Sequence, residues 1–302
     1  MYCHYRYYGG SYFKLCTEGD SIMEATYMKR KKDGRIHIKS GNKGDRAVRW
    51  TLMILTVLTV VAFLFFNYTG LELGSAITET AYNMKVMFLE PALSHFDLGE
   101  AVYQVGITLG LAFLSTIIGA IIAFFLSLMA ATNLSPVWLS RIVRVFVAIT
   151  RAVPTVLWVL IFAIAAGLGS EAAILGMLFH SIAYLVKAFS EAFEEVDKGI
   201  IEALQATGAN WWHIVKSGIL PSTFTYLLSW VFLRFEINFG VAVAMGAAAG
   251  AGGIGFELFM ASGFYFDLRE VGFITYAILI IAFVLEIIST RMKKRYFPAT
   301  SD

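Results

Sequence analysis

The strongest constraint on this chain is a series of six apolar stretches, each about as long as a helix that crosses a lipid bilayer. Such a helix needs about 20 mostly apolar residues. The six stretches are expected at residues 50–68, 102–130, 145–168, 172–189, 223–245 and 271–290. Hydrophobic residues make up 58% of the 302 residues and charged residues only 15%, against about 25% in a soluble domain. A soluble single-core fold is excluded, and the sequence predicts an all-α membrane protein with six transmembrane helices.

The first 49 residues differ from the rest because they are polar, with nine Lys and Arg between positions 29 and 49. We expect a disordered basic tail there, without a folded domain. The basic run fits attraction to anionic lipid headgroups. It fits better with the general bias of Lys and Arg toward the cytosolic side of membrane proteins. Cys3 and Cys16 lie in this tail and form no metal-ligand or disulfide pattern.

The apolar stretch at residues 50–68 is interpreted as a retained anchor, because it exceeds the roughly 7–15 residues of a signal-peptide core. Residues 69–98 and the residues ahead of Glu270 are expected as loops. Eighteen of the 24 Lys and Arg lie on segments that are cytosolic if the N-terminus is inside, and only Lys85 and Arg269 lie on external ones. This asymmetry predicts that both termini, including a tail at residues 296–302, are cytosolic.

A polar segment at residues 190–222 separates the fourth and fifth apolar stretches and is cytosolic in this orientation. Apolar residues recur in it at helical spacing: Ile200, Leu204, Trp211, Val215 and Ile219. Gly208 permits a sharp turn between two short amphipathic helices, and Pro221 marks entry into the next element. Such a pair either docks in a groove of another protein or rests on the lipid surface. Periodicity alone does not separate these alternatives.

The residue spacing in this segment resembles the EAA loop of bacterial ABC importer permeases. That loop runs Glu-Ala-Ala, three residues, Gly, nine residues, Ile, one residue, Leu-Pro. The chain matches it at Glu202, Ala203, Gly208, Leu220 and Pro221. It departs at Leu204, in the place of the third Ala, and at Gly218, in the place of Ile. The resemblance extends over residues of about 100 to 295.

This resemblance implies a type I ABC importer permease fold in a bacterial inner membrane, with two copies of the chain forming a pathway. It implies that residues 190–222 form coupling helices, which insert into a cleft on an ATP-hydrolysing subunit. It also implies an extracytoplasmic solute-binding protein as a partner. We therefore expect no catalytic residues, cofactor or metal in this chain, membrane lipid around it, and no nucleic-acid partner.

Three further segments resemble the phosphonate permease family. They read RAVP from Arg151, RFEIN from Arg234 and GAGGIG from Gly250. Related permeases for phosphate or phosphite share much of this pattern. Phosphonate is therefore the preferred substrate, with phosphate, phosphite or another small solute such as an amino acid as alternatives. The candidate pathway residues are Arg151, Pro154, Arg234, Glu236, Asn238, Gly252, Gly253 and Gly255.

Charged residues within the apolar stretches allow two interpretations, because charges at membrane depth usually face a bundle interior or a pathway. Arg234 could attract an oxyanion, or it could form a structural ion pair with Glu236, which we favour. Arg151 could likewise attract an oxyanion or form a structural ion pair, or its side chain could extend to the cytosolic edge of the membrane. Pro154 is expected to kink its helix and to free a carbonyl that needs another partner.

Patterns for nucleotide binding and catalysis are incomplete. The glycines at 250, 252 and 255 satisfy GxGxxG, but no strand precedes them, and Lys216-Ser217 lacks the preceding Gly of a P-loop. The five histidines form no metal-ligand pattern. A membrane enzyme acting on lipid-linked phosphate would need a dense polar cluster at one face, which the sequence does not show. A secondary transporter would leave the coupling loop unexplained.

Overall fold

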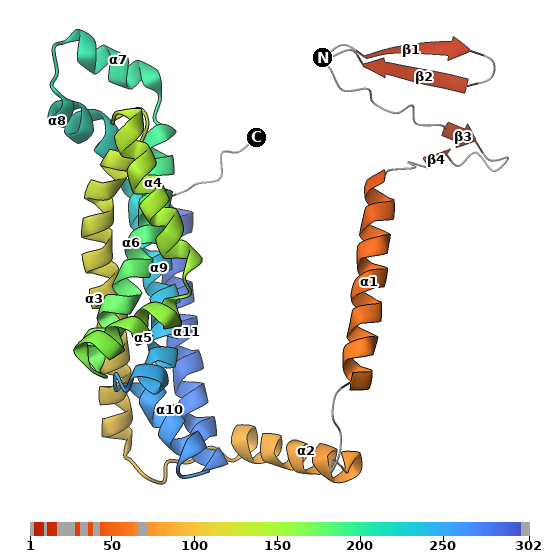
Figure 1. The fold of residues 1–302 in the computed structure, drawn as a ribbon, viewed down its shortest axis with the longest axis vertical. Helices are drawn as coiled ribbons and strands as arrows, with labels where there is room; N and C mark the ends of the chain where they lie inside the picture. Colours follow the sequence, from red (N-terminus) through yellow and green to blue (C-terminus); the bar gives the residue numbers. More distant parts are fainter. Residues whose placement is uncertain are drawn as a thin grey trace. The chain divides into compact units, whose positions relative to one another are not determined.

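The computed structural model describes residues 3–8, 11–16, 28–30, 36–38, 43–65 and 72–296. The chain divides into two compact units, residues 1–73 and 74–302. In the first unit β1 (Cys3–Tyr8) pairs with β2 (Ser11–Cys16), β3 (Met28–Arg30) pairs with β4 (Ile36–Ile38), and α1 spans Lys43–Phe65 (Figure 1). The sequence predicted a disordered tail rather than these short antiparallel pairs. The expected end of the anchor at residues 66–68 and the expected tail beyond residue 296 lie outside the described residues.

Helix α1 has the length and composition of a membrane span. Its segment Arg46–Phe65 contains 20 residues, which is about 30 Å at 1.5 Å per residue. The hydrocarbon core of a bilayer is also about 30 Å thick. The side chains described in this segment are all exposed, so its apolar surface is available to lipid.

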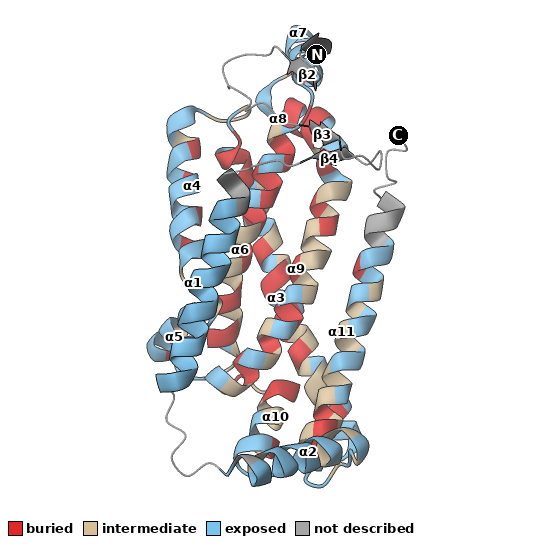
Figure 2. Ribbon diagram, turned by 90° about the vertical axis from the view of Figure 1, so that its right-hand side faces the viewer, coloured by how far each residue is buried: buried red, intermediate tan, exposed pale blue. Residues whose placement is uncertain are grey.

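Three long helices form the centre of the second unit. They are α3 (Leu98–Ala130), α6 (Ser170–Glu194) and α9 (Leu220–Ala249), and each packs against the other two. Their buried residues lie along the sides that face one another (Figure 2). Gly119 permits a close approach, because a Cβ there would lie 3.0 Å from Cβ of Ser181. Small residues allow helix backbones to approach closely where hydrophobic burial from water does not drive packing.

The other helices surround this centre. α10 (Ile254–Gly263) and α11 (Leu268–Tyr296) pack on α9, whereas α4 (Val137–Ala152) and α5 (Thr155–Ala166) pack on α6. The approach of α5 is especially close, since a Cβ on Gly176 would lie 2.4 Å from Val159 Cγ2. The end of α2 (Leu73–Leu89) contacts α11, where the Tyr276 hydroxyl donates a 2.7 Å hydrogen bond to the carbonyl of Phe88.

The predicted third span, residues 145–168, is divided between two helices that meet at 90°. The break lies at Pro154, which lacks an N–H group and whose ring clashes with the carbonyl four residues earlier in a regular helix. That carbonyl, of Thr150, accepts a 3.0 Å hydrogen bond from Trp158 Nε1. The expected kink and the new partner of the freed carbonyl are therefore confirmed. The predicted boundary needs correction, because α4 already begins at Val137.

Five described helices are long and apolar enough to cross a membrane, and the bent pair of α4 and α5 would make a sixth. They coincide with the predicted stretches, so the predicted α-helical membrane fold is confirmed. Two predicted loops contain helices instead. The connection at residues 69–98 contains α2, and the connection ahead of Glu270 contains α10. Acidic residues had favoured a loop in the first connection, and a glycine-rich stretch had favoured one in the second.

Candidate coupling segment and membrane polar cluster

The candidate coupling segment, predicted at residues 190–222, is residues 195–219 in the structure, because α6 extends to Glu194 and α9 begins at Leu220. It begins with a short helix at one end of the bundle (Figure 1). The carboxylate of Asp197 starts α7 (Lys198–Ala206) by accepting a 2.8 Å hydrogen bond from the amide two residues later, as an N-cap residue does. The helix ends at Gly208, whose φ of +80° is in the left-handed region that favours glycine. The amides of Gly208 and Ala209 bond back to α7 carbonyls and close its last turn.

The second half of the coupling segment is continuous with the fifth span. Asn210 caps α8 (Trp211–Ile214), which passes through the π-helical turn η1 (Val215–Ile219) into α9. The amide of Leu220 donates to the carbonyl five residues back. The wide turn relieves the clash that Pro221 would make in a regular helix. The predicted second amphipathic helix is therefore not separate but forms the first part of the α9 span.

Helix α7 turns one face toward η1 and the other away from the bundle. Ile201 is buried and Leu204 is partly buried, three residues apart on one side of the helix. Glu202 and Ala203 are exposed. Within the described part of the chain, Glu202 has no hydrogen bond or ion pair. The residues that match the loop pattern thus form two groups: Glu202 and Ala203 are exposed, whereas Gly208, Leu220 and Pro221 shape the backbone.

Leu204 and Gly218, the two residues that depart from the loop pattern, lie against each other. A Cβ on Gly218 would lie 2.9 Å from Leu204 Cδ1 and 3.3 Å from Ile200 Cγ2. The α7 side chains therefore occupy the space that a side chain at position 218 would need. The pattern has a small residue at 204 and a large one at 218, and this chain has the reverse. The combined side-chain size between α7 and η1 differs from that of the pattern by only one carbon group, so the exchange nearly conserves volume.

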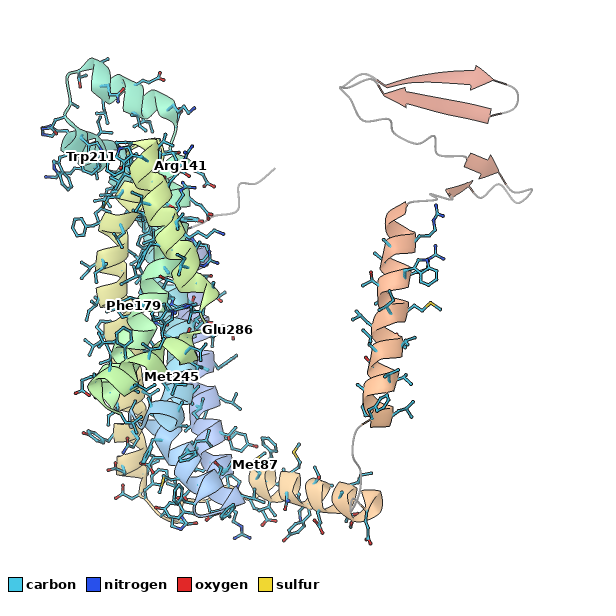
Figure 3. The ribbon with its side chains drawn as sticks, viewed as in Figure 1. Met87, Arg141, Phe179, Trp211, Met245 and Glu286 are labelled. Carbon is cyan, nitrogen blue, oxygen red and sulfur yellow. The ribbon has the colours of Figure 1, made fainter. Side chains whose placement is uncertain are left out.

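The coupling segment is fastened to the connection between α3 and α4. Trp211, which lies at this end of the bundle (Figure 3), donates from Nε1 to the carbonyl of Leu134 at 2.9 Å. At the end of α6, Glu194 accepts two 2.6 Å hydrogen bonds from Thr132 and one from Arg144 of α4. Movement of the coupling segment would therefore be passed to the ends of α3, α4 and α6.

A buried polar cluster lies between α3, α6 and α9. Nδ2 of Asn238 donates to Thr116 Oγ1 at 2.8 Å, Ser181 Oγ at 2.9 Å and Ser115 Oγ at 3.3 Å. One turn earlier on α9, Nε of Arg234 donates to the same Ser181 oxygen at 3.0 Å. Arg234 is only 2% exposed. The structure thus brings the predicted pathway residues Arg234 and Asn238 together on Ser181.

Glu236 does not pair with Arg234. Residues two apart on a helix point to different sides, and Glu236 is only partly buried. Among the ion pairs of the described residues, none contains Glu236 or Arg234. The predicted structural ion pair is therefore wrong, and Glu236 does not take part in the hydrogen-bonded cluster.

Arg151 approaches the cluster from the last turn of α4. Its guanidinium carbon lies 5.9 Å from the centroid of the Tyr184 ring, and that of Arg234 lies 5.4 Å from the same centroid. Arg151 is exposed and lines a cavity of about 210 Å³ together with Arg144 and Lys187. The predicted residues Arg151 and Arg234 therefore share one aromatic neighbour.

The glycine-rich turn between α9 and α10 docks on α3. Gly252 and Gly253 have φ values of +74° and +77°, and the Gly253 amide donates to Gln104 Oε1 at 3.0 Å. A Cβ on Gly255 would lie 1.8 Å from the carbonyl oxygen of Val243. These glycines thus provide a tight bend and a close helix contact, as expected. No hydrogen bond within the described residues joins them to the polar cluster.

A cluster that sequence reasoning missed lies at the start of α11. Buried Glu270 accepts a 2.9 Å hydrogen bond from the His95 amide and contacts His95 Nδ1 at 2.7 Å. The Tyr265 ring stacks on His95 with centroids 3.9 Å apart. Asp267 lies nearby, and a hydrogen bond from the Ser94 side chain lowers the pKa of its carboxyl. Because Glu270 is engaged by amides and the imidazole, this cluster fastens the α2–α3 connection to α11.

Comparison with known proteins identifies the architecture that these features belong to. Residues 123–302 match the family described as binding-protein-dependent transport system inner membrane component. The chain belongs to this family. The match covers the coupling segment and the α6 and α9 parts of the polar cluster, so both candidate sites of this permease lie largely within it.

Two curated relatives and one solved structure agree with this assignment. The putative phosphite transport system permease protein HtxC of Stutzerimonas stutzeri is 33% identical over 206 residues, 68% of this chain and 72% of that relative. The putative cryptic phosphonate transport system permease protein PhnE2 of Escherichia coli is 34% identical over 123 residues, 40% of this chain and 98% of that relative. A chain of the inward-facing MetNI methionine ABC transporter superposes with a TM-score of 0.59 at 22% identity, covering 68% of this chain and 99% of that one. The predicted ABC importer permease fold is confirmed.

Sequence reasoning missed three residues that the structure of this permease places at its sites. Ser181 and Tyr184 bring α6 into the polar cluster, and Trp211 fastens the coupling segment. Ser181 and Tyr184 lie three residues apart in an apolar stretch, hence on one side of a helix. Two polar residues on one side of an otherwise apolar helix were the sequence signal that could have identified Ser181 and Tyr184.

Proposed function

We propose that this permease is the membrane-spanning subunit of an ATP-driven importer for a small phosphorus oxyanion, phosphonate or phosphite. The observation that carries the proposal is a largely exposed helix, α7, which packs through Leu204 on η1 at the end of the bundle. A helix presented in this way suits insertion into a groove on a partner. Relatives that serve phosphite and phosphonate systems support the substrate class.

In this proposal, α7 enters a cleft on a separate ATPase subunit, which hydrolyses the ATP. The exposed Glu202 and Ala203 make contact there, and Gly208 keeps the turn that follows. When the two ATPases close, the coupling segment moves. The Trp211–Leu134 hydrogen bond and the contacts of Glu194 carry this movement to α3, α4 and α6. The apolar core between these helices transmits it as a rigid displacement.

The translocation pathway would lie beside α4, α6 and α9. Its expected residues are Arg151, Pro154, Arg234, Glu236, Asn238, Gly252, Gly253 and Gly255. The helix break at Pro154 gives α4 and α5 separate directions, so one can move without the other. Guanidinium groups suit phosphorus oxyanions because their N–H groups match pairs of oxygen atoms.

The permease would act as a homodimer in a bacterial inner membrane, with both termini in the cytosol. The distribution of Lys and Arg supports that orientation. An extracytoplasmic solute-binding protein would deliver the substrate at the end of the bundle that contains α10. Exposed apolar side chains along α3 and α5 are available to a second copy and to lipid.

The test is the ATPase activity of the permease, purified in nanodiscs with its ATPase and binding protein. The complex is titrated with methylphosphonate, phosphite, phosphate and methionine. Stimulation by methylphosphonate or phosphite is expected. Stimulation by methionine alone would assign an amino acid importer, and failure of any ATPase to co-purify would overturn the coupling role of α7. A complex with Glu202→Arg and Ala203→Arg should also lose the ATPase, because both side chains lie on the exposed face.

A further inference from the structure

Two guanidinium groups lie beside one aromatic ring in the membrane part of the permease. The guanidinium carbons of Arg151 and Arg234 lie 5.9 Å and 5.4 Å from the centroid of Tyr184. An aromatic face attracts a cation at this distance, but it does not neutralise the charge. No ion pair of the described residues contains either arginine.

The acidic residues on the surrounding helices do not compensate this charge. On α6, Glu171 in the first turn accepts a hydrogen bond from Ser170, Glu191 lies 3.6 Å from Lys187, and Glu194 is paired with Arg144. Helices α4 and α5 contain no acidic residue, and the single one on α9, Glu236, contacts no cation of the described residues. On α3 the single acidic side chain accepts a hydrogen bond from a glutamine. The pair of arginines therefore keeps its positive charge.

Three buried polar atoms in this region have no hydrogen-bond partner within the described structure: Arg234 Nη2, Asn238 Oδ1 and His180 Nδ1. Arg234 is 98% buried, at 2% relative exposure, so its open donor cannot bond freely to bulk water. An unmade hydrogen bond on a buried charged group is costly. Buried donors of this kind are satisfied in most proteins, which indicates that a further acceptor belongs here.

Arg151, which lies beside the same Tyr184 ring as Arg234, also lines a cavity of about 210 Å³ between α4 and α6. Its charged lining residues are Arg144, Arg151, Lys187 and Glu191, so cations outnumber acids there three to one. His180, Tyr184 and Lys187 follow at spacings of four and three residues, so they lie on one face of α6. On this face Lys187 lines the cavity and the Tyr184 ring lies beside Arg234 of α9, so cationic groups that attract an anion lie both at the cavity and beside Tyr184.

We propose that Arg151, Tyr184 and Arg234 form an anion-binding site that holds the phosphorus oxyanion within the membrane. Arg151 would meet the anion from the cavity side, and Nη2 of Arg234 would supply a buried donor. Tyr184 positions both guanidinium groups. This inference rests on the proposed function and adds the residues that select for negative charge. Neither guanidinium group has an acidic partner among the ion pairs of the described residues, and both would repel the ammonium group of an amino acid, so the site favours an anion.

The test uses the complete transporter in liposomes, with uptake of methylphosphonate and phosphite at saturating binding protein. Arg151→Cys is made in a background with Cys3→Ser and Cys16→Ser. Uptake should fall about tenfold or more, the effect of losing one hydrogen bond to a charged group. Reaction with a methanethiosulfonate that carries an ammonium group should restore uptake, and one that carries a sulfonate should not. Arg141→Cys, exposed on the same helix (Figure 3), is the matched control and should respond to neither reagent.

Arg234→Lys and Arg234→Gln form the second pair, because the lysine keeps the charge and the glutamine does not. The lysine variant should retain more uptake than the glutamine variant, and co-purification with the ATPase shows that both are folded. Wild-type transporter that imports neither oxyanion would refute the proposed function. If the wild type imports an oxyanion, uptake by Arg151→Cys and Arg234→Gln within twofold of the wild-type rate would refute the anion site alone. Equal restoration of uptake by both reagents would refute it as well.

Discussion

Exchanging the sizes of the side chains at positions 204 and 218 tests how α7 is held against η1. At present Leu204 fills the space beside Gly218, where an added Cβ would lie 2.9 Å from Leu204 Cδ1. We therefore compare Gly218→Ile, Leu204→Ala and the double variant. The double variant restores the residue sizes of the EAA pattern at both positions.

The expected magnitudes follow from burial. Leu204→Ala should weaken the attachment of α7 by about 1–2 kcal/mol, since burying a whole leucine is worth more and this one is partly exposed. Gly218→Ile alone should destabilise the contact by overpacking, which costs about 1–3 kcal/mol. Replacing a glycine within a helix offsets up to about 1 kcal/mol of this cost. In the double variant the isoleucine fills the space that the leucine leaves. The attachment of α7 in the double variant should thus be about 1–2 kcal/mol more stable than the sum of the two single effects predicts.

Hydrogen exchange of the α7 amides in nanodiscs measures this attachment as a local opening free energy. Each single variant should exchange faster, about fivefold to tenfold for 1–1.4 kcal/mol, and the double variant should return close to wild type. Gly240→Ile is the matched control, because a Cβ there meets nothing within 4 Å, and it should leave α7 exchange unchanged. The reasoning would be refuted if exchange in the double variant were accelerated by the product of the two single-variant factors.

Three further outcomes are expected. Gly208→Val should destabilise the end of α7 by about 1–2 kcal/mol, because a β-branched residue is strained at a φ of +80°; unchanged exchange over α7 and normal uptake would contradict this. Trp158→Phe should leave the Thr150 carbonyl without its donor and cost about 1–3 kcal/mol, seen as lower thermal stability than wild type; equal stability would show that the carbonyl has another partner. Acid should loosen the α2–α3 connection, because a hydrogen bond from Ser94 lowers the Asp267 pKa in the folded protein. That stabilisation is present above the unfolded pKa of about 3.9 and is lost as the pH falls through the lower folded pKa. Asp267→Asn should remove this pH dependence, and an identical acid response in the variant would exclude Asp267 as its source.

Local features of the chain could be predicted because their causes are local. The apolar stretches, the kink at Pro154 and the polar segment between the fourth and fifth stretches all depend on residues close together in sequence. The turn at Gly208 is of the same kind, since its backbone conformation is one that glycine adopts readily. The π-helical turn before Pro221 was not foreseen, because the sequence analysis took Pro221 as the start of a new element and not as part of a continuous helix.

Contacts between distant residues could not be predicted from one sequence. The sequence favoured Glu236 as the partner of Arg234, yet Arg234 bonds to Ser181, 53 positions away. Likewise, Leu204 and Gly218 counted as two mismatches until their contact showed one exchange of size.

The sequence by itself determined that this chain enters a membrane and which apolar stretches are long enough to cross it. Those properties follow from the length and polarity of continuous segments, because a bilayer accepts apolar helices wherever they occur. Only the tertiary structure decided which side of each helix faces its neighbours. The rotation of each helix about its axis and the close packing of α3, α6 and α9 place Arg234, Asn238 and Ser181 together. Both depend on contacts between segments that are distant in sequence, so no single apolar stretch specifies them.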